Sequence, residues 1–321
     1  MLPEQTGAQT APNPHDAGIA GRAVRTPIRP DPHGQGLQRF RTAKAGEIAR
    51  LTALNAAGRL PAPFRGPRPS FRAALRTRPD GLPAVIAEYK RASPSAGAIA
   101  PDLLPEDVAR QYAESGAACL SVLTEEAYFR GDPAFLARMA GLPLLRKDFL
   151  FHPLQIAETA ATPASALLLI VRLTPDVALL RRLREEAEAF GLDAVVEVFD
   201  AADLALARAA GSRIIQVNAR DLESFAVDRA ACLRLADAFR HDANGREEIW
   251  IAASGLERRE HLTAAADAGF DAVLLGTALM RGGRPGEALR ALLDADVQTP
   301  PDKAQANKAQ TGREGTSCPA R

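Results

Sequence analysis

Two opposite charges stand two residues apart at the end of an apolar stretch. The segment AVIAEYKRASPSAG, residues 84–97, begins as a strand, carries Glu88 and Lys90, and then passes into a turn of small residues. Side chains alternate across a strand, so both charged groups point to the same face. An acid and an amine are costly to bury unless they are paired. The combination indicates acid–base chemistry at the C-terminal end of a barrel strand.

Further polar residues follow later apolar strands in the same manner. Lys147 ends one predicted strand, Glu197 lies within VVEVFD, and Asn218 ends another strand shortly before Arg220. Glu197 has apolar neighbours on both sides, and it points inward if Val195 does. The active site of a (β/α)8 barrel is built from strand C-termini and the loops after them. These residues are therefore predicted to meet at one barrel mouth.

A plainer interpretation exists for each of these residues taken singly. A lone polar residue at a strand end is often a solvated loop start or a helix cap, and Lys147 alone could be a surface lysine. We interpret three aspartates as solvated loop starts or helix caps: Asp148, Asp200 and Asp221. Four ionisable groups are predicted to meet at one barrel mouth, and accident is the weaker explanation for that convergence. These groups are Glu88, Lys90, Lys147 and Glu197.

Small residues follow the last two predicted strands and favour a phosphate site. One segment contains Ser254-Gly255 and the other Gly276-Thr277. The loops after strands 7 and 8 of such barrels commonly bind phosphate together with a helix N-terminus. Glycine lets the backbone approach an anion, free N–H groups favour its charge, and the two hydroxyls add donors. The alternative is that the glycines only make tight turns.

From residue 84 onward, strand patterns alternate with helical patterns. The eight predicted strands are 84–90, 118–123, 143–147, 166–171, 193–198, 213–218, 248–253 and 271–275. Such an alternation fits a closed (β/α)8 barrel or an open doubly wound sheet. No strand is followed by a G-x-G-x-x-G turn, which disfavours a dinucleotide-binding sheet. The count of eight, with polar residues gathered at strand ends, favours an α/β (β/α)8 TIM barrel.

The flanking segments are predicted to be a helical extension and two tails. Residues 36–83 are predicted to form three consecutive segments. The first is a helix that ends at Gly58, the second is a proline-rich connector, and the third is a short helix capped by Ser70. The clearest helix between strands spans 174–191, with Thr174 as its cap. The barrel with its extension is assigned to residues 36–296. The remaining residues, 1–35 and 297–321, contain too few large apolar side chains to fold and are predicted to be disordered.

Composition narrows the possible partners and compartment. The net charge of +1 argues against a dedicated nucleic-acid binder, and no apolar run reaches membrane-spanning length. The first residues lack the pattern of a secretory signal. The three cysteines, Cys119, Cys232 and Cys318, are scattered without disulfide or metal-ligand spacing. We expect a cytoplasmic protein that acts on a small molecule without nucleic acid or membrane, as a monomer or weak oligomer.

In order and spacing, the motifs resemble those of the indole-3-glycerol-phosphate synthase family of tryptophan biosynthesis. They are IAEYKRASPSAG, SVLTEEAYFRG, LLRKDFL, LLLIV, VVEVFD, NARDL, ASG and LLGTALM. The resemblance covers about residues 40–295, and EYKRxSPS and LRKDF are its most specific parts. It implies a (β/α)8 lyase that converts 1-(2-carboxyphenylamino)-1-deoxyribulose 5-phosphate to indole-3-glycerol phosphate, carbon dioxide and water. It also implies that the enzyme uses no metal and no organic cofactor.

The resemblance assigns roles residue by residue. Lys147 would be the general acid of ring closure, and Glu197 the general base of the later dehydration. Glu88 and Lys90 would bracket the reacting centre, while Asn218 would orient the ribulosyl hydroxyls. The remaining assignments are binding roles. Arg220 would help to shape the loop of Asn218. The anthranilate pocket would be lined by Phe129, Phe149 and Leu168, and the phosphate would be held by Ser93, Gly255, Gly276 and Thr277. Which lysine acts at which step is left open.

Three departures from the family pattern stand out. The glutamate that usually precedes the Ser-Gly of the seventh strand is Ala253 here, and we hypothesise that Glu88 and Glu197 suffice. The basic residue that usually follows Ser-Pro-Ser is Ala96. Gln216 and Ala219 replace a more common glycine and a polar residue around Asn218.

Two alternatives compete with this function. The isomerase of the preceding pathway step would need a cysteine and aspartate pair at strand ends, which the sequence does not show. A relative that binds phosphate but has lost or weakened catalysis is supported only by Ala253.

Overall fold

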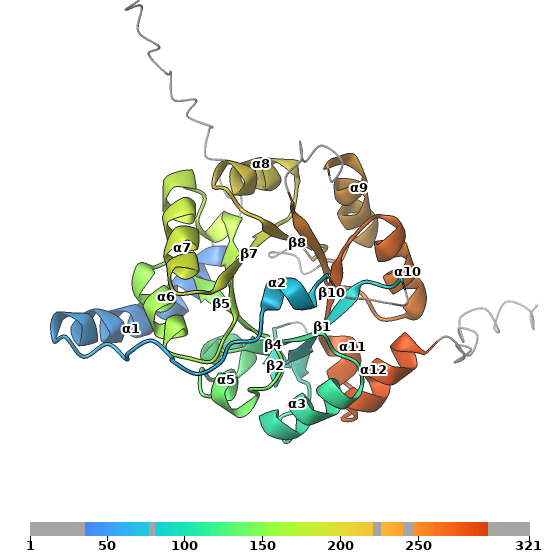
Figure 1. Ribbon diagram of the computed structural model, residues 1–321, viewed down its shortest axis with the longest axis horizontal. Coiled ribbons are helices and arrows are strands. Elements are labelled where there is room, and N and C mark those ends of the chain that lie inside the picture. Colours follow the sequence, from blue (N-terminus) through green and yellow to red (C-terminus); the bar gives the residue numbers. More distant parts are fainter. Residues whose placement is uncertain (1–35, 77–80, 95, 221–225, 240–246, 295–321) are drawn as a thin grey trace, which may run out of the picture. The chain divides into compact units, whose positions relative to one another are not determined.

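The predicted strands close into one parallel barrel. The structure, a computed structural model, describes residues 36–76, 81–94, 96–220, 226–239 and 247–294. Each barrel strand pairs in parallel with two neighbours, and β1 pairs with both β4 and β10, which closes the ring (Figure 1). The strands are β1 (Ala84–Tyr89), β4 (Cys119–Leu123), β5 (Leu144–Leu150), β6 (Ala166–Ile170), β7 (Asp193–Val198), β8 (Ile214–Asn218), β9 (Ile249–Ala253) and β10 (Ala272–Leu275). The predicted α/β barrel is confirmed.

One strand is longer than predicted. Strand β5 continues to Leu150, beyond the expected end at Lys147, and its register with β6 shifts between Arg146 and Leu150. The other strand limits agree with the prediction to within one residue. Lys147 therefore lies inside a strand, and Phe149 shares its inward face two residues further along.

The alternation of side chains defines two apolar layers. Ile86, Val195 and Ile214 belong to a buried cluster inside the barrel. Their neighbours in sequence face the helices and form the larger outer core. Steps of two residues from these interior positions put Glu88 and Glu197 on the inward face, as predicted.

Helices surround the barrel and cover the outer core (Figure 1). They are α3 (Pro105–Glu114), α4 (Glu126–Phe129), α5 (Phe135–Arg138), α6 (Pro153–Ala160), α7 (Val177–Ala189), α8 (Ala201–Ala209), α9 (Arg229–Phe239), α10 (Arg259–Asp267), α11 (Thr277–Met280) and α12 (Pro285–Leu293). A short hairpin, β2 (Ala92–Ser93) with β3 (Gly97–Ala98), follows β1.

The N-cap predicted for helix α7 was wrong. Residues Val171–Leu173 form a 3-10 turn directly after β6, and the Thr174 hydroxyl bonds back to the carbonyl of Ile170. The helix therefore starts later, where Asp176 accepts hydrogen bonds from the N–H groups of Ala178 and Leu179. Asp200 caps α8 in the same way, as predicted.

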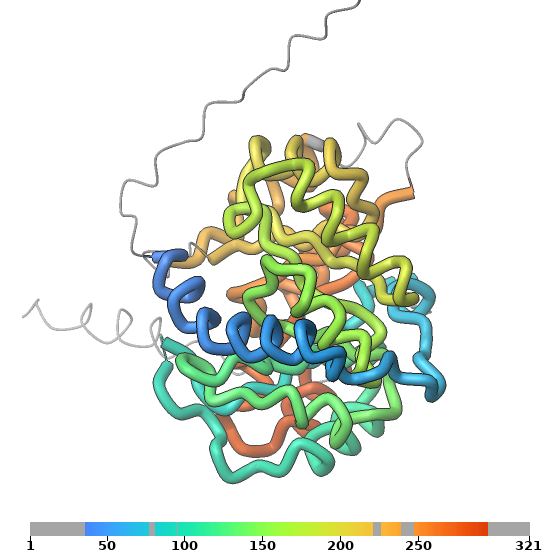
Figure 2. The backbone as a smooth tube through the Cα atoms, turned by 90° about the vertical axis from the view of Figure 1, so that its left-hand side faces the viewer, coloured from blue at the N-terminus to red at the C-terminus, as the bar shows by residue number. Residues whose placement is uncertain are grey.

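The N-terminal extension adds one helix beside the barrel and one at its end. Helix α1 (Gly36–Ala56) lies along α6 (Figure 2). Helix α2 (Phe71–Ala74) is capped by Ser70, as predicted, and covers the end at which the strands begin (Figure 1). Phe71 and Leu75 are buried there against the interior cluster. The predicted tails, 1–35 and 297–321, and Asp221 lie outside the described residues.

Asp148 is not the solvated residue or cap that the sequence suggested. It is buried on the outward face of β5, where its carboxylate contacts Lys44 of α1 at 2.7 Å and Arg146 at 3.2 Å. Arg146 also bonds Glu158 of α6 at 3.1 Å, and Lys44 bonds Glu47 at 2.7 Å. Arg146 and Asp148 flank Lys147 in sequence, so this ion cluster fixes β5 from outside while Lys147 faces inward.

We expect Asp148→Asn to lower the free energy of unfolding by about 3 kcal/mol at pH 7, because it leaves two buried cations short of one carboxylate. Burial alone would raise the pKa of Asp148, but Arg146 and Lys44 outweigh it and hold that pKa below its ordinary value. A depressed pKa means that the stabilisation is complete above the unfolded-state pKa, about 4, and is lost as pH falls through the folded-state value. Urea unfolding of both proteins at pH 7 and pH 3 measures this, and an equal difference at both pH values would contradict it.

Candidate active site

The predicted polar residues of the site come together at the carboxyl end of the barrel. Glu88 lies on β1, Lys147 on β5, Glu197 on β7 and Asn218 on β8, each on the inward face. Because the strands are parallel and the sheet is closed, their carboxyl ends share one rim. Residues remote in sequence thus line the same mouth.

Glu88 and Lys90 form the ion pair that their spacing indicated. The Lys90 ammonium lies 2.7 Å from Glu88 Oε1, and both side chains are largely buried. The hydroxyl of Tyr112 on α3 donates to the backbone carbonyl of Glu88 at 3.1 Å, which holds this strand end from outside. A Cβ atom at position 276 would overlap Glu88 Oε1 and crowd Lys90 Nζ. Gly276 is therefore the residue that lets the last βα loop pack against the pair.

Lys147 has a different environment from Lys90. Its side chain is half-buried, and within the described part of the chain no carboxylate lies at salt-bridge distance from its ammonium. The adjacent Arg146 and Asp148 are held in the outer ion cluster. The ammonium of Lys147 is thus positioned by a rigid strand but is not held in an ion pair, which suits a proton donor.

Glu197 is buried and hydrogen-bonded by its neighbour across the sheet. The residue is almost completely enclosed, and Gln216 Nε2 donates to its Oε2. Asn218 Oδ1 accepts the backbone N–H of Arg220 at 2.9 Å, which leaves the Asn218 amide protons free to donate elsewhere. Arg220 lies in an isolated backbone bridge with Val227, and its expected part in shaping this loop stays a prediction.

An aromatic wall lies beside these polar groups. Phe149 is inward on β5, with Phe129 of α4 at 6.2 Å between ring centroids. Leu168 is buried on the inward face of β6. Sequence reasoning missed Phe40 of α1, which stacks on Phe149 at 3.8 Å between centroids. The available signal was that Phe40 is the single aromatic residue of its helix.

The predicted phosphate residues occupy tight turns at the same end. Ser254 and Gly255 both have positive φ, 74° and 73°. Helix α11 begins at Thr277 directly after Gly276, so the expected helix start is confirmed. Ser93 lies in the hairpin after β1, is buried, and accepts the N–H of Ala96 at 3.2 Å. The predicted phosphate residues thus come from the loops after the first, seventh and eighth barrel strands.

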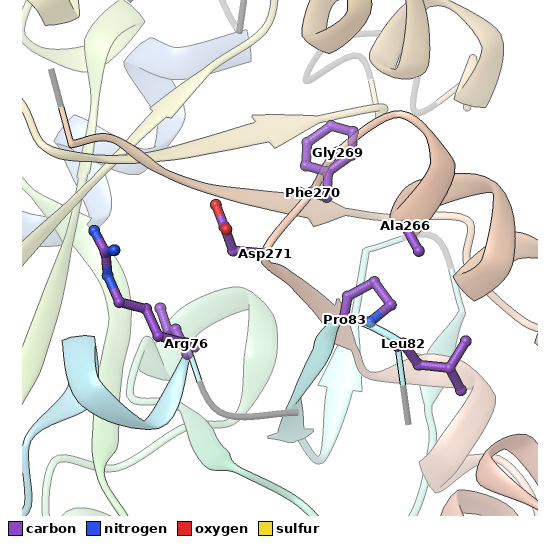
Figure 3. Close-up of a pocket in the computed structure, with 9 residues that line it drawn as sticks. Arg76, Leu82, Pro83, Ala266, Gly269, Phe270 and Asp271 are labelled. Carbon is purple, nitrogen blue, oxygen red and sulfur yellow. The ribbon is translucent and has the colours of Figure 1, made fainter. Parts of the chain in front are cut away.

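A separate cavity lies at the opposite end of the barrel. It measures about 340 Å³ and is bordered by Arg76 after α2, Pro83 before β1, and Phe270 and Asp271 before β10 (Figure 3). This is the end at which strands begin, so it contains none of the predicted catalytic groups. Within the described ranges, no three His, Cys, Asp or Glu side chains gather as metal ligands would.

The fold and this rim define a class: a (β/α)8-barrel enzyme with its active site at the carboxyl ends of the strands. The chain belongs to the indole-3-glycerol phosphate synthase family, whose model matches residues 37–292. The resemblance inferred from the motifs is confirmed. None of the helices in the described part of the chain combines the length and apolarity that crossing a bilayer requires.

Several relatives carry the same name. The indole-3-glycerol phosphate synthase of Carboxydothermus hydrogenoformans is 38% identical over 250 residues, covering 77% of this chain and 90% of its own. That of Acidithiobacillus ferrooxidans is 44% identical over 246 residues, covering 75% and 90%. That of Chlorobaculum tepidum is 40% identical over 254 residues, covering 76% and 94%. The chain therefore spans nearly the whole length of these relatives.

Proposed function

We propose that this protein is an indole-3-glycerol-phosphate synthase that works by general acid–base catalysis. Its substrate would be 1-(2-carboxyphenylamino)-1-deoxyribulose 5-phosphate. A carbon–carbon bond forms between the ring carbon that bears the carboxylate and the ketone carbon, carbon dioxide leaves, and water is then lost to give the indole. The proposal rests on membership of the family together with the position of Lys147. This lysine points inward on a barrel strand and forms no ion pair with the described residues.

The first proton transfer is assigned to Lys147. Ring closure needs a ketone made electrophilic by a positioned acid, and an ammonium can donate that proton. Lys90 already lies 2.7 Å from a carboxylate oxygen, so its ammonium is held in an ion pair with Glu88. The ion cluster behind β5 holds the Lys147 backbone in place, which favours a fixed reaction geometry.

The later steps are assigned to the other buried carboxylate and the ion pair. Loss of carbon dioxide restores the aromatic ring, so it needs no external electron sink. Dehydration needs a base for the ring nitrogen proton and an acid for the departing hydroxyl. Glu197 is proposed as the base, and the Glu88–Lys90 pair as the group beside the leaving hydroxyl.

Substrate binding is divided between an apolar side and a polar side. Phe129, Phe149 and Leu168 would hold the carboxyphenyl ring, with Phe40 extending that wall. Asn218 would donate to the ribulosyl hydroxyls. The phosphate would lie on the loop backbones and hydroxyls of Ser93, Ser254, Gly255, Gly276 and Thr277.

The isomerase alternative is weakened by the cysteine environments. Burial, with a smaller contribution from Asp193, raises the pKa of Cys119 to about 12, and burial raises the pKa of Cys232 to about 12. Neither thiol would ionise near neutral pH, so neither suits acid–base exchange on a sugar phosphate. We also propose that the protein works in the cytoplasm as a monomer or weak oligomer, on the strength of its composition and of the two described cysteines, Cys119 and Cys232, which form no disulfide.

The proposal is tested by incubating the purified protein with the carboxyphenylamino-deoxyribulose phosphate and following indole fluorescence. A catalytic amount of protein is expected to convert the substrate completely. Absence of fluorescence at an enzyme concentration close to that of the substrate would contradict the synthase assignment and support a relative that only binds phosphate.

The hypothesis that Glu88 and Glu197 suffice without a third carboxylate at position 253 gives a separate prediction for Ala253→Glu. Ala253 is buried, inward, and paired in register with Asn218. If Glu88 and Glu197 suffice, an added carboxylate gains no role and brings a buried charge beside Asn218, so kcat should stay within about tenfold of the wild type. Steady-state kinetics of both proteins decide this, because a gain of several orders of magnitude would show that the missing acid limits the rate.

A further inference from the structure

We infer that Gln216 is a positioning residue for Glu197, with its side-chain amide fixing which carboxylate oxygen faces the barrel mouth. The inference rests on the proposed function, since it concerns how the proposed general base is held. In the sequence, Gln216 stands out only as a departure from the family pattern. The structure places it directly opposite Glu197 in the register of β7 and β8.

The contact between the two side chains is specific. Gln216 Nε2 donates to Glu197 Oε2, and Gln216 is fully buried. Among the described residues, no other side chain donates to the Glu197 carboxylate. The reverse orientation of the amide would set its carbonyl oxygen against a carboxylate oxygen, so the donor assignment follows from charge. With Oε2 occupied, Glu197 Oε1 remains for proton transfer.

A purely structural role does not account for this amide. Gln216 sits on the inward face between Ile214 in its own strand and Ile251 opposite it in β9, both part of the apolar interior. Its Oε1 is buried and lacks a partner, which is a cost that an apolar side chain of the same length would avoid. A buried, half-satisfied amide in an apolar layer is explained if its donor acts on the carboxylate beside it.

A double-mutant cycle in kcat tests the inference. Gln216→Met keeps an unbranched side chain of similar length and removes the donor. Glu197→Met is used because Gln at that position would still accept a hydrogen bond. We expect Gln216→Met to lower kcat about tenfold with KM within about threefold, and to change kcat less than about twofold when Glu197 is already replaced. Ile214→Val, inward on the same strand, is the matched control, and its small effect should be equal in both backgrounds.

The outcomes separate this inference from the proposed function. An inactive wild type would overturn the synthase assignment. An active wild type in which Gln216→Met causes the same loss in both backgrounds would overturn the inference alone. If Glu197→Met is too slow to measure, thermal unfolding of the same four proteins replaces kcat. Gln216→Met should then lower Tm clearly in the wild type and little in Glu197→Met, and equal losses would show that the contact does not hold the carboxylate.

Discussion

Replacing Lys147 with alanine should abolish turnover while leaving substrate affinity within about tenfold, roughly 1.4 kcal/mol. A general acid acts on the transition state, so its loss falls on kcat, by about a thousandfold or more. The binding surfaces stay in place because Arg146 and Asp148 hold β5 through the outer ion cluster. Calorimetric titration of the variant with substrate gives the affinity, and steady-state kinetics give kcat.

Lys147→Arg is the matched control for charge. It keeps a cation at the same strand position, but a guanidinium does not give up its proton in a protein. If Lys147 supplies a proton, the arginine variant should be nearly as inactive as the alanine variant. Recovery of activity by arginine, or a loss of binding that parallels the loss of turnover, would assign Lys147 to electrostatic binding instead.

Glu197→Gln is expected to slow formation of the indole about a hundredfold or more while sparing carbon dioxide release. The reason is the order of the steps. Ring closure and decarboxylation come before dehydration, and Glu197 is proposed as the base of dehydration, the last step. The glutamine side chain keeps the size of the glutamate and can still accept a hydrogen bond from Gln216. In a single turnover with carboxyl-labelled substrate, labelled carbon dioxide should appear before the indole chromophore.

Equal slowing of both products would contradict this division of roles. It would place Glu197 at or before ring closure. Glu88→Gln provides the comparison, because its partner is the ammonium of Lys90 at 2.7 Å rather than a neutral amide. Removing that charge leaves Lys90 without its carboxylate, so substrate binding as well as rate should change.

The barrel and the inward positions at its polar rim were predictable because local patterns determine them. Strand length, apolar runs and the two-residue alternation are enough to identify the inward positions of Glu88 and Glu197 in the sequence. The spacing of Glu88 and Lys90 indicates their pairing, and the structure shows it. Family motifs then supply the roles, which stay predictions until they are measured.

Contacts between segments remote in sequence were not predictable in this way. The sequence around Asp148 predicts a helix cap or a solvated residue. Only the packing of α1 against the barrel brings Lys44 into contact with it. Phe40 likewise reaches Phe149 only because α1 lies against the barrel. The start of α7 was misplaced for a local reason, since the 3-10 turn after β6 uses Thr174 before the helix begins.

The most direct test of the proposed mechanism is the stoichiometry of the reaction with carboxyl-labelled substrate. Wild-type protein should release one labelled carbon dioxide for each indole-3-glycerol phosphate formed over many turnovers, and Lys147→Ala should release neither. A wild type that binds the substrate but forms no indole, or that forms indole at an undiminished rate after Lys147→Ala, would contradict the proposed catalytic mechanism.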